Sequence, residues 1–298
     1  FKNVSSSAPE AKAWMLGRVA ASTTWGTPAS VAAIGPASPG PTVGVFLRQL
    51  AAARDNERAE SSRRRCRFID ASPELYVQRA SWVFPLANST YLGRMKLYAS
   101  LTSPFARKIR ILVAEKSIPC ELVVDDPNAP NSPVSGLNPL GKVPVMLRDD
   151  GSALFDSPVI LEWLDRSRSP ALIPAEGEER WQVLRWQGLA DGLMDAVVTR
   201  MIELRRAPEH QSKTALAHQE GKVTRALSWA NERVGGAEYL VDAFSLADIA
   251  LGAALDYLDF RYPHAWRAGF PDLDCWHAAI SRRPSFAATL PPGLERPA

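Results

Sequence analysis

The sequence has few cysteines and no long apolar segment. Its three cysteines, Cys66, Cys120 and Cys275, lie far apart and form no CxxC pair. This spacing argues against a disulfide framework or a zinc site and favours a reducing, cytoplasmic location. The longest mildly apolar run, residues 31–46, is interrupted by glycine and prolines. We therefore expect no membrane-spanning segment and no membrane partner.

Histidine is also scarce, and the motifs of several enzyme classes are missing. The four histidines have neither the spacing of metal ligands nor that of a catalytic triad, and GxSxG and HExxH are absent. Residues 136–142 match the beginning of a phosphate-binding loop. Val143 then replaces the required Ser or Thr, and Pro144 prevents the helix that would hold the phosphate. We expect no metal and no phosphate-binding loop.

Excess positive charge is confined to the beginning of the chain. Residues 1–94 contain 12 Lys and Arg against 6 Asp and Glu, whereas residues 95–298 contain 23 against 26. The first segment is rich in Ala, Ser, Pro and Arg and has no helical or strand period, which predicts a disordered extension that the functional protein lacks. A transit peptide is the alternative. The basic run at 63–67 lies in this segment, so we expect no nucleic-acid partner.

From Met95 onward, strand and helix patterns alternate. The expected elements are a strand at 96–99, a helix opened by Ser103 and Pro104, a strand at 120–124, strands at 143–147 and 153–155 around a turn, and a helix opened by Ser157 and Pro158. A βαβ crossover makes the first two strands parallel. Residues 95–168 are therefore predicted to form an α/β thioredoxin-like domain of βαβαββα order.

The rest of the chain has a helical period. A linker is expected at 169–179, followed by an all-α bundle at 180–298. Within it, Ser245 to Asp248 form a capping box for a helix that is apolar on nearly all sides. That helix is predicted to lie at the centre of the second domain.

Three short motifs carry the candidate chemistry. The first places the hydroxyl of Ser103 at a helix N-terminus, where unpaired N–H groups and the helix dipole stabilise a thiolate. Thr102 and Tyr98 offer further hydroxyls within reach, so the activating group stays open between them. A plain helix cap is the alternative role for Ser103.

The other two motifs add groups that bind a peptide. A cis Pro144 would turn the backbone N–H and C=O of Val143 outward as a strand edge, beside Lys142, which either meets a carboxylate or is solvated. Asp156 and Ser157 open a helix and can hold the ammonium and carboxylate of an amino-acid head group. Together, the three motifs describe a site for a small thiol peptide.

This combination resembles the glutathione S-transferases from residue 95 to near the C-terminus, and small bacterial members of the YibF type in particular. The matching segments are Thr102 to Phe105, Asn138 to Pro144, Phe155 to Pro158 and Leu189 to Asp195. The resemblance implies a homodimer with glutathione as co-substrate. The residues that it implies for glutathione binding are Phe105, Lys142, Val143, Pro144, Asp156, Ser157 and Asp195. Val143 is implied to pair with the cysteinyl backbone, Asp156 and Ser157 to hold the γ-glutamyl end, and Asp195 to reach the same end of the partner's site across the dimer.

One departure from the family pattern bears on the reaction. Classes that form mixed disulfides have Cys where this chain has Ser103, and Cys120 is expected at the far end of the first helix. The resemblance therefore favours transfer of glutathione to a small electrophile, a detoxification chemistry, with an acceptor wall near residues 260–266. The alternative is a non-catalytic binding or stress-related adaptor protein of the same fold.

Overall fold

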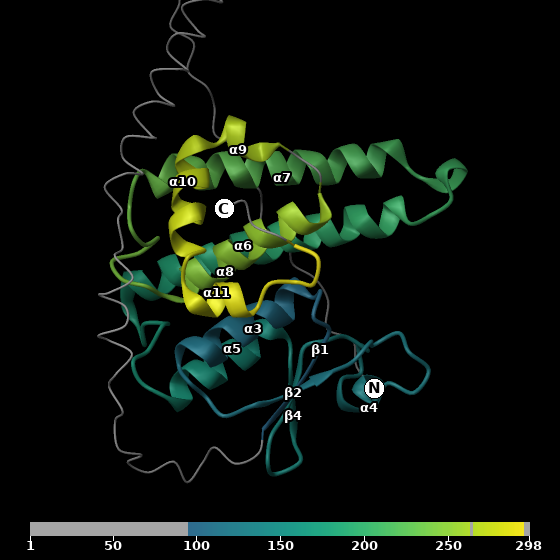
Figure 1. The fold of residues 1–298 in the computed structure, drawn as a ribbon, viewed down its shortest axis with the longest axis vertical. Coiled ribbons are helices and arrows are strands. Elements are labelled where there is room, and N and C mark those ends of the chain that lie inside the picture. The colour runs from purple at the N-terminus through teal and green to yellow at the C-terminus, as the bar shows by residue number, and fades with distance from the viewer. Residues whose placement is uncertain (1–94, 263–264, 295–298) are drawn as a thin grey trace, which may run out of the picture. The chain divides into compact units, whose positions relative to one another are not determined.

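The computed structural model describes residues 95–262 and 265–294. The predictions for residues 1–94, including the basic run, lie outside the described residues. In the described part, a small sheet with flanking helices comes first, and a set of longer helices follows (Figure 1). None of the described helices has the length and apolar character that a membrane span requires.

The sheet has four strands in the order β2-β1-β3-β4. Strands β1 (Lys96–Ala99) and β2 (Glu121–Val124) are parallel, with Lys96 opposite Glu121. Strand β3 (Val145–Leu147) pairs antiparallel with β1 and with β4 (Ala153–Phe155). The predicted thioredoxin-like arrangement is thus confirmed, although β2 and β3 begin one and two residues later than expected.

Three helices accompany the sheet: α3 (Pro104–Glu115), α4 (Val134–Leu137) and α5 (Ser157–Ser167). Helix α3 begins as the sequence predicts, with Ser103 as N-cap and Pro104 in the first turn. Helix α5 begins one residue earlier than expected, because Asp156 is its N-cap and Ser157, the expected cap, is its first residue. Apolar side chains of both helices are buried in the core, among them Ile109, Leu112 and Ile160. Local sequence signals therefore determine where the helices that flank the candidate site begin.

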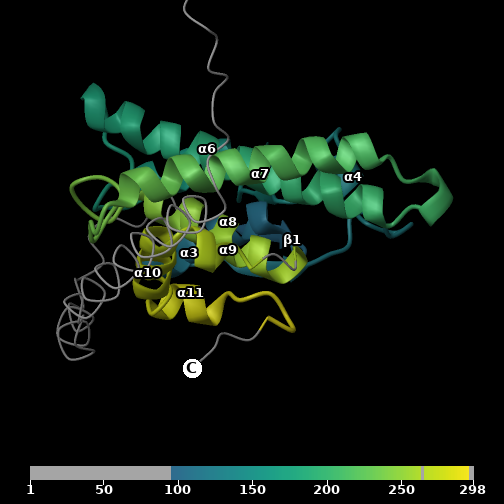
Figure 2. The ribbon, with the colours of Figure 1, turned by 90° about the horizontal axis from the view of Figure 1, so that it is seen from above.

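The second part is helical throughout. Its elements are α6 (Gly177–Leu204), the 3-10 turn η1 (Pro208–His210), α7 (Lys213–Val234), α8 (Leu246–Arg261), α9 (Trp266–Gly269), α10 (Pro271–Ile280) and α11 (Pro284–Ala288). In α8 every residue from Leu246 to Leu258 is buried, and Ser245 and Asp248 form the expected capping box. The central position predicted for this helix is confirmed. Helices α6 and α7 run side by side (Figures 1 and 2).

Buried polar contacts bring the end of α3 to the beginning of α8. Lys116 forms an ion pair with Asp165 near the end of α5. The same carboxylate accepts a hydrogen bond of 2.8 Å from the backbone N–H of Leu172, whose carbonyl oxygen in turn accepts one of 3.0 Å from the N–H of Leu246. The chain that leaves the sheet is thereby held against both helices.

A second ion pair joins the two helices near their other ends. Arg107, in the first half of α3, lies 2.7 Å from Asp256, in the second half of α8. Since the end of α3 meets the beginning of α8, the two helices run antiparallel. The last turn of α8 therefore lies beside the beginning of α3, where Ser103 is located.

Two residues differ from what the sequence pattern suggests. Trp181 continues the apolar helical period of α6 through Leu184 and Leu193, but its side chain is 63% exposed. Cys275 is disulfide-bonded, which the spacing of the cysteines did not predict, whereas Cys120 is free.

Candidate functional site

The hydroxyl of Ser103 lies at the N-terminus of α3. Its backbone is extended (φ −76°, ψ 120°), and its Oγ accepts a hydrogen bond of 3.3 Å from the backbone N–H of Ala106. The hydroxyl proton remains able to donate to a ligand. The neighbouring Thr102 Oγ1 is engaged at 3.1 Å with the Oγ of Ser100. Ser103 therefore combines the helix dipole with a donor suited to an anion.

Among the residues that the structure describes, Cys120 is the free cysteine, and its thiol does not compete for this position. Burial raises the pKa of the Cys120 thiol to about 11, so it is protonated at neutral pH. The residue directly precedes β2, away from the beginning of α3. A thiolate at Ser103 has to come from a ligand rather than from Cys120.

The loop before β3 has the geometry expected from its sequence. The Val143–Pro144 peptide bond is cis, as predicted. Asn138 is buried and holds the loop, because its Nδ2 donates to the carbonyl oxygen of Lys142 at 2.8 Å and its Oδ1 accepts from the N–H of Leu140 at 3.0 Å. No backbone hydrogen bond of Val143 is found among the described residues. Its N–H and C=O are thus available to an extended peptide.

Asp156 and Ser157 combine a strained backbone with an unsatisfied hydroxyl. Asp156 has φ 45°, which is uncommon for a residue other than glycine, and its Oδ1 accepts a hydrogen bond of 2.7 Å from the N–H of Ser157. Ser157 is fully buried, and its Oγ has no hydrogen-bond partner within the described part of the chain. Backbone strain and an unpaired buried hydroxyl are costly, and both are typical of ligand-binding positions.

Charged side chains of α3 and α6 interact electrostatically with Asp156. The Asp191 and Asp195 carboxylates are four residues apart on α6 and so share one face. Burial raises the pKa of the Asp195 carboxyl, and Asp156 raises it further, while Lys142 and Lys108 oppose the shift. Asp156, Asp195 and Lys142 therefore belong to one electrostatic neighbourhood within a single chain.

Lys108 is the residue of this neighbourhood that the sequence reasoning missed. Its ammonium is completely buried and forms an ion pair with Asp191. Burial lowers the pKa of Lys108, and the charges of Asp191, Asp156 and Asp195 oppose that change. The nitrogen also lies 5.7 Å from the centre of the Phe105 ring. Spacing could have revealed this residue, because positions 105, 108 and 112 share the inward face of α3.

Comparison with known proteins identifies the family to which these features belong. Models of the glutathione S-transferase N-terminal and C-terminal domains match residues 102–167 and 213–279. An uncharacterized GST-like protein of Escherichia coli K12, YibF, is 37% identical over 200 residues, which cover 66% of this chain and 99% of the relative. The chain belongs to the glutathione S-transferase family.

The transferase relationship extends to solved structures and to relatives with other names. A glutathione S-transferase from Methylobacillus flagellatus KT, solved with GSH bound, is 42% identical and superposes with a TM-score of 0.64, covering 66% of this chain and 99% of that chain. A stringent starvation protein A homolog of Haemophilus ducreyi is 25% identical over 202 residues, 66% of this chain and 89% of the relative. Membership therefore gives the fold, while the activity has to be argued from the site.

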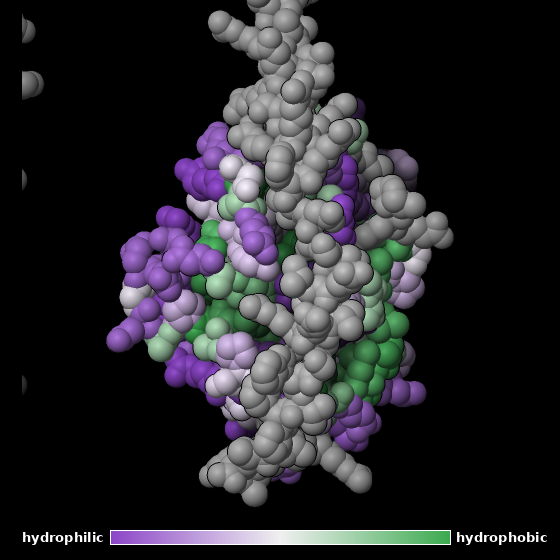
Figure 3. Space-filling view, turned by 60° about the vertical axis from the view of Figure 1, so that its left-hand side comes forward, coloured by the Kyte–Doolittle hydropathy of each residue, from purple (hydrophilic) through white to green (hydrophobic). Residues whose placement is uncertain are grey.

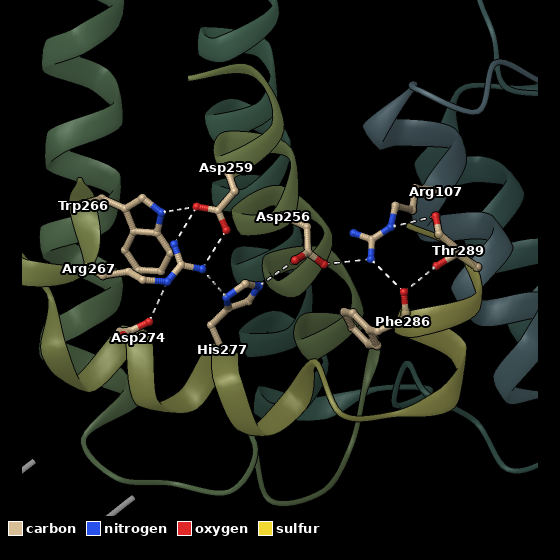
Figure 4. Close-up of polar contacts among 9 residues, drawn as sticks. All are labelled: Arg107, Asp256, Asp259, Trp266, Arg267, Asp274, His277, Phe286 and Thr289. Atoms are coloured by element: carbon tan, nitrogen blue, oxygen red, sulfur yellow. Dashed lines mark hydrogen bonds and ion pairs between the residues drawn. The ribbon is translucent and has the colours of Figure 1, made fainter. Parts of the chain in front are cut away.

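A second charged cluster, outside the transferase motifs, links α3 to the helical part (Figure 4). The Asp256 carboxylate forms an ion pair with Arg107 on one side. On the other side it forms a hydrogen bond of 3.1 Å with the Nε2 of His277. Arg267 lies 3.3 Å from the Nδ1 of His277 and binds both oxygens of Asp259 at 2.7 Å. Because arginine only donates, Nδ1 is the acceptor, and Nε2–H donates to Asp256.

The same cluster brings together two carboxylates and a histidine, which are residue types that bind metals. The spacing of the histidines in the sequence did not indicate this group. Ligand atoms of Asp256, Asp259 and His277 lie within 4.8 Å of one another. Both carboxylates are already bound by guanidinium groups, which also occupy the space that a cation would need. We regard this cluster as an ion-pair network that fixes α8, α10 and α3 together rather than as a metal centre.

Proposed function

We propose that the protein binds glutathione, activates its thiol and transfers it to a small electrophile. The observation that carries this proposal is the buried Ser157 hydroxyl, which has no partner among the described residues, beside the strained Asp156 at the beginning of α5. A peptide with an amino-acid head group would satisfy the hydroxyl. The GSH-bound relative from Methylobacillus flagellatus supports the choice of peptide.

In this proposal each motif binds one part of glutathione. The backbone of Val143 pairs with the cysteinyl residue, and the position of Val143 is set by Pro144. Asp156 and Ser157 hold the γ-glutamyl end, where Asp195 adds a second carboxylate for the ammonium. Lys142 meets a carboxylate of the peptide, and Phe105 lines the site at the first turn of α3. These assignments agree with the charges that surround Asp195.

Ser103 is proposed to hold the thiolate. Its hydroxyl donates to the sulfur, with Thr102 as the alternative donor, and the N-terminus of α3 adds the field of the helix dipole. The thiol proton leaves to solvent, the sulfur forms a bond to the electrophilic carbon, and the leaving group departs with its electron pair. Metal takes no part in this sequence of steps. Detoxification of electrophiles is the corresponding role.

A homodimer is part of the proposal. Apolar side chains are exposed on neighbouring elements: Val159 of α5 is 51% exposed and Trp181 of α6 is 63% exposed. These helices are close together, because Arg180 of α6 lies 3.0 Å from Glu162 of α5. Hydrophobic side chains are visible among hydrophilic ones on one face of the described part (Figure 3). A second copy would cover such side chains. Light scattering should give twice the chain mass.

The second candidate is a non-catalytic adaptor of the same fold. The starvation-protein relative favours it, since its name denotes no transferase. Calorimetric titration with glutathione separates the two candidates, together with an assay of conjugation to an aryl halide. The transferase proposal expects saturable binding that Ser157→Val weakens, accompanied by turnover. Ser167→Val, on the same helix but away from the site, is the matched control. Absence of binding would favour the adaptor.

A further inference from the structure

Arginine and aromatic side chains gather where the C-terminal ends of α6 and α8 meet. The guanidinium of Arg200 lies 4.0 Å from the centre of the Tyr262 ring, and that of Arg261 lies 4.0 Å from the centre of the Phe260 ring. The Tyr257 hydroxyl is 4.0 Å from the sulfur of Met201, which ties the two helices together. We define the arginine–aromatic cluster as Arg200, Arg205, Tyr257, Phe260, Arg261 and Tyr262.

The arginines of this cluster have no carboxylate partner among the residues that the structure describes. The Nε atoms of Arg200 and Arg261 are buried and form no hydrogen bond there. By contrast, Arg267 and Arg283 each lie 2.7 Å from a carboxylate oxygen. Unpaired, buried cationic donors are costly and are normally satisfied by an anion. Arg200 and Arg261 are half-buried, and their buried Nε donors are the groups that an anion could satisfy.

The aromatic members lie next to these charges, and of the three rings Phe260 is the one that is only partly buried. Tyr257 and Tyr262 are only 4% and 3% exposed. Burial raises the pKa of both hydroxyls, while Arg261 and Arg205 oppose the shift at Tyr257, and Arg200 opposes it at Tyr262. Glu220 of α7 also acts on Tyr262 and raises the pKa of its hydroxyl further. Three guanidinium groups thus act on the two tyrosine hydroxyls, and in the part of the chain that the structure describes none of the three forms an ion pair.

The cluster lies beyond the end of α3 that carries the proposed thiolate. From the Arg107–Asp256 ion pair, Ser103 is about 6 Å back along α3, and Arg261 is about 7.5 Å forward along the antiparallel α8. On α6, Arg200 follows Asp195 by little more than one turn. A molecule attacked by a thiolate at Ser103 therefore has the arginine–aromatic cluster on its far side.

We propose that the arginine–aromatic cluster binds a carboxylate of the electrophile, so that this transferase selects acidic acceptors over neutral ones of the same shape. The guanidinium of Arg200 or Arg261 meets the carboxylate with two parallel N–H···O bonds, and the partly exposed Phe260 ring contacts the apolar body. This inference rests on the proposed function, because it concerns the acceptor side of the same site.

A nitroaryl chloride illustrates the reaction. In 4-chloro-3-nitrobenzoate the thiolate sulfur bonds to the ring carbon that bears chlorine. The carbon–chlorine bond then breaks, and chloride leaves with the electron pair. The thiol proton goes to solvent, and the product is S-(4-carboxy-2-nitrophenyl)glutathione. No oxidant or reductant is needed. The matched neutral compound is the carboxamide, which differs only in the group that the cluster would bind.

Calorimetry of the two product conjugates tests the proposal without requiring turnover. The full chain should bind the carboxylate conjugate about ten- to a hundredfold more tightly than the carboxamide conjugate, as expected for a charge-assisted hydrogen bond. Arg200→Gln and Arg261→Gln should each reduce that ratio several-fold while leaving the affinity for glutathione unchanged. Arg233→Gln, an arginine stacked on Trp229 at the far end of α7, is the matched control and should keep the ratio.

Each outcome separates this inference from the proposed function. Equal affinity of the wild-type protein for the two conjugates, or a ratio that both variants retain, would overturn the acidic-acceptor proposal. Binding of glutathione without binding of either conjugate would overturn it as well. Failure to bind glutathione itself would instead refute the proposed function. If a variant does not fold, the wild-type ratio and its decrease with added salt still decide the question.

Discussion

The buried ion pair between Lys108 and Asp191 provides the sharpest test of how the site is held. The Lys108 side chain is fully buried, whereas that of Asp191 is 21% exposed. Removing one member of such a pair leaves an uncompensated charge and costs about 3–5 kcal/mol of unfolding free energy. Replacing both members by apolar groups of similar size is often neutral or stabilising by about 1–4 kcal/mol. We therefore expect strong coupling between the two positions.

The perturbation is a double-mutant cycle of Lys108→Met, Asp191→Leu and the double variant. Each single variant should lose about 3 kcal/mol or more in urea unfolding at pH 7, and the double variant should recover most of the loss. Additive losses, with the double variant the least stable protein, would refute the reasoning. Arg166→Met with Glu162→Leu, an exposed pair at 2.8 Å, is the control cycle and should show a coupling below about 1 kcal/mol.

The pH dependence of Lys108→Met follows from the same charges. Burial raises the pKa of Asp191 above its ordinary value, and the Lys108 charge opposes that shift. Without Lys108 the folded-state pKa rises further, so the folded protein binds more protons than the unfolded chain below that pKa. Its stability deficit should therefore shrink on acidification from pH 7 toward 5. If the stability deficit of Lys108→Met stays constant over this range, the uncompensated charge is not that of Asp191.

Two further predictions concern single carboxylates. Burial raises the pKa of Asp248 from its ordinary value of 3.8 to about 6. The protonated carboxyl therefore contributes its full stabilisation below pH 3.8, and this contribution is lost as the pH rises through 6. The loss amounts to roughly 3 kcal/mol. In urea unfolding, the stability of Asp248→Asn should not show this decrease between pH 4 and 7. The prediction is contradicted if the unfolding free energies of the two proteins change with pH in the same way. Asp195→Ala should weaken glutathione binding by about 1–3 kcal/mol in calorimetry, as for a lost charged hydrogen bond. Unchanged affinity would exclude Asp195 from the γ-glutamyl site.

Features set by neighbours in sequence could be predicted, and features set by distant partners could not. Ser103 and Pro104 begin α3 as predicted, because a helix cap depends on a few adjacent residues. The cis peptide at Pro144 and the capping box of α8 have the same local origin. Thioredoxin-like topology followed from the order of the strands and helices together with the rule for parallel crossovers.

The charged clusters, by contrast, depend on residues that are far apart in the sequence. Lys108 and Asp191 are 83 residues apart, and Asp256 and His277 are 21 apart. Spacing alone gave no reason to pair either set, because a helix period shows which face is inward but not which residue meets it. The exposure of Trp181 was missed for a related reason. Its place on the stripe of α6 was periodic, but what packs against that turn depends on the other helices.

The thiolate titration of bound glutathione tests the central claim most directly. A thiol with pKa near ~8.5 needs roughly 1.4 kcal/mol of preferential thiolate stabilisation for each unit of depression. The Ser103 hydroxyl can supply about 1.5–3 kcal/mol, and the helix terminus about 0.3–1 kcal/mol more. The account predicts that the ultraviolet thiolate band of the bound peptide titrates one to three units below the free value, and that Ser103→Ala raises this pKa and slows conjugation roughly ten- to a hundredfold. If only Thr102→Ala moves the titration, activation passes to Thr102. If neither variant moves it, the claim that this transferase activates the thiol through a hydroxyl at the N-terminus of α3 is contradicted.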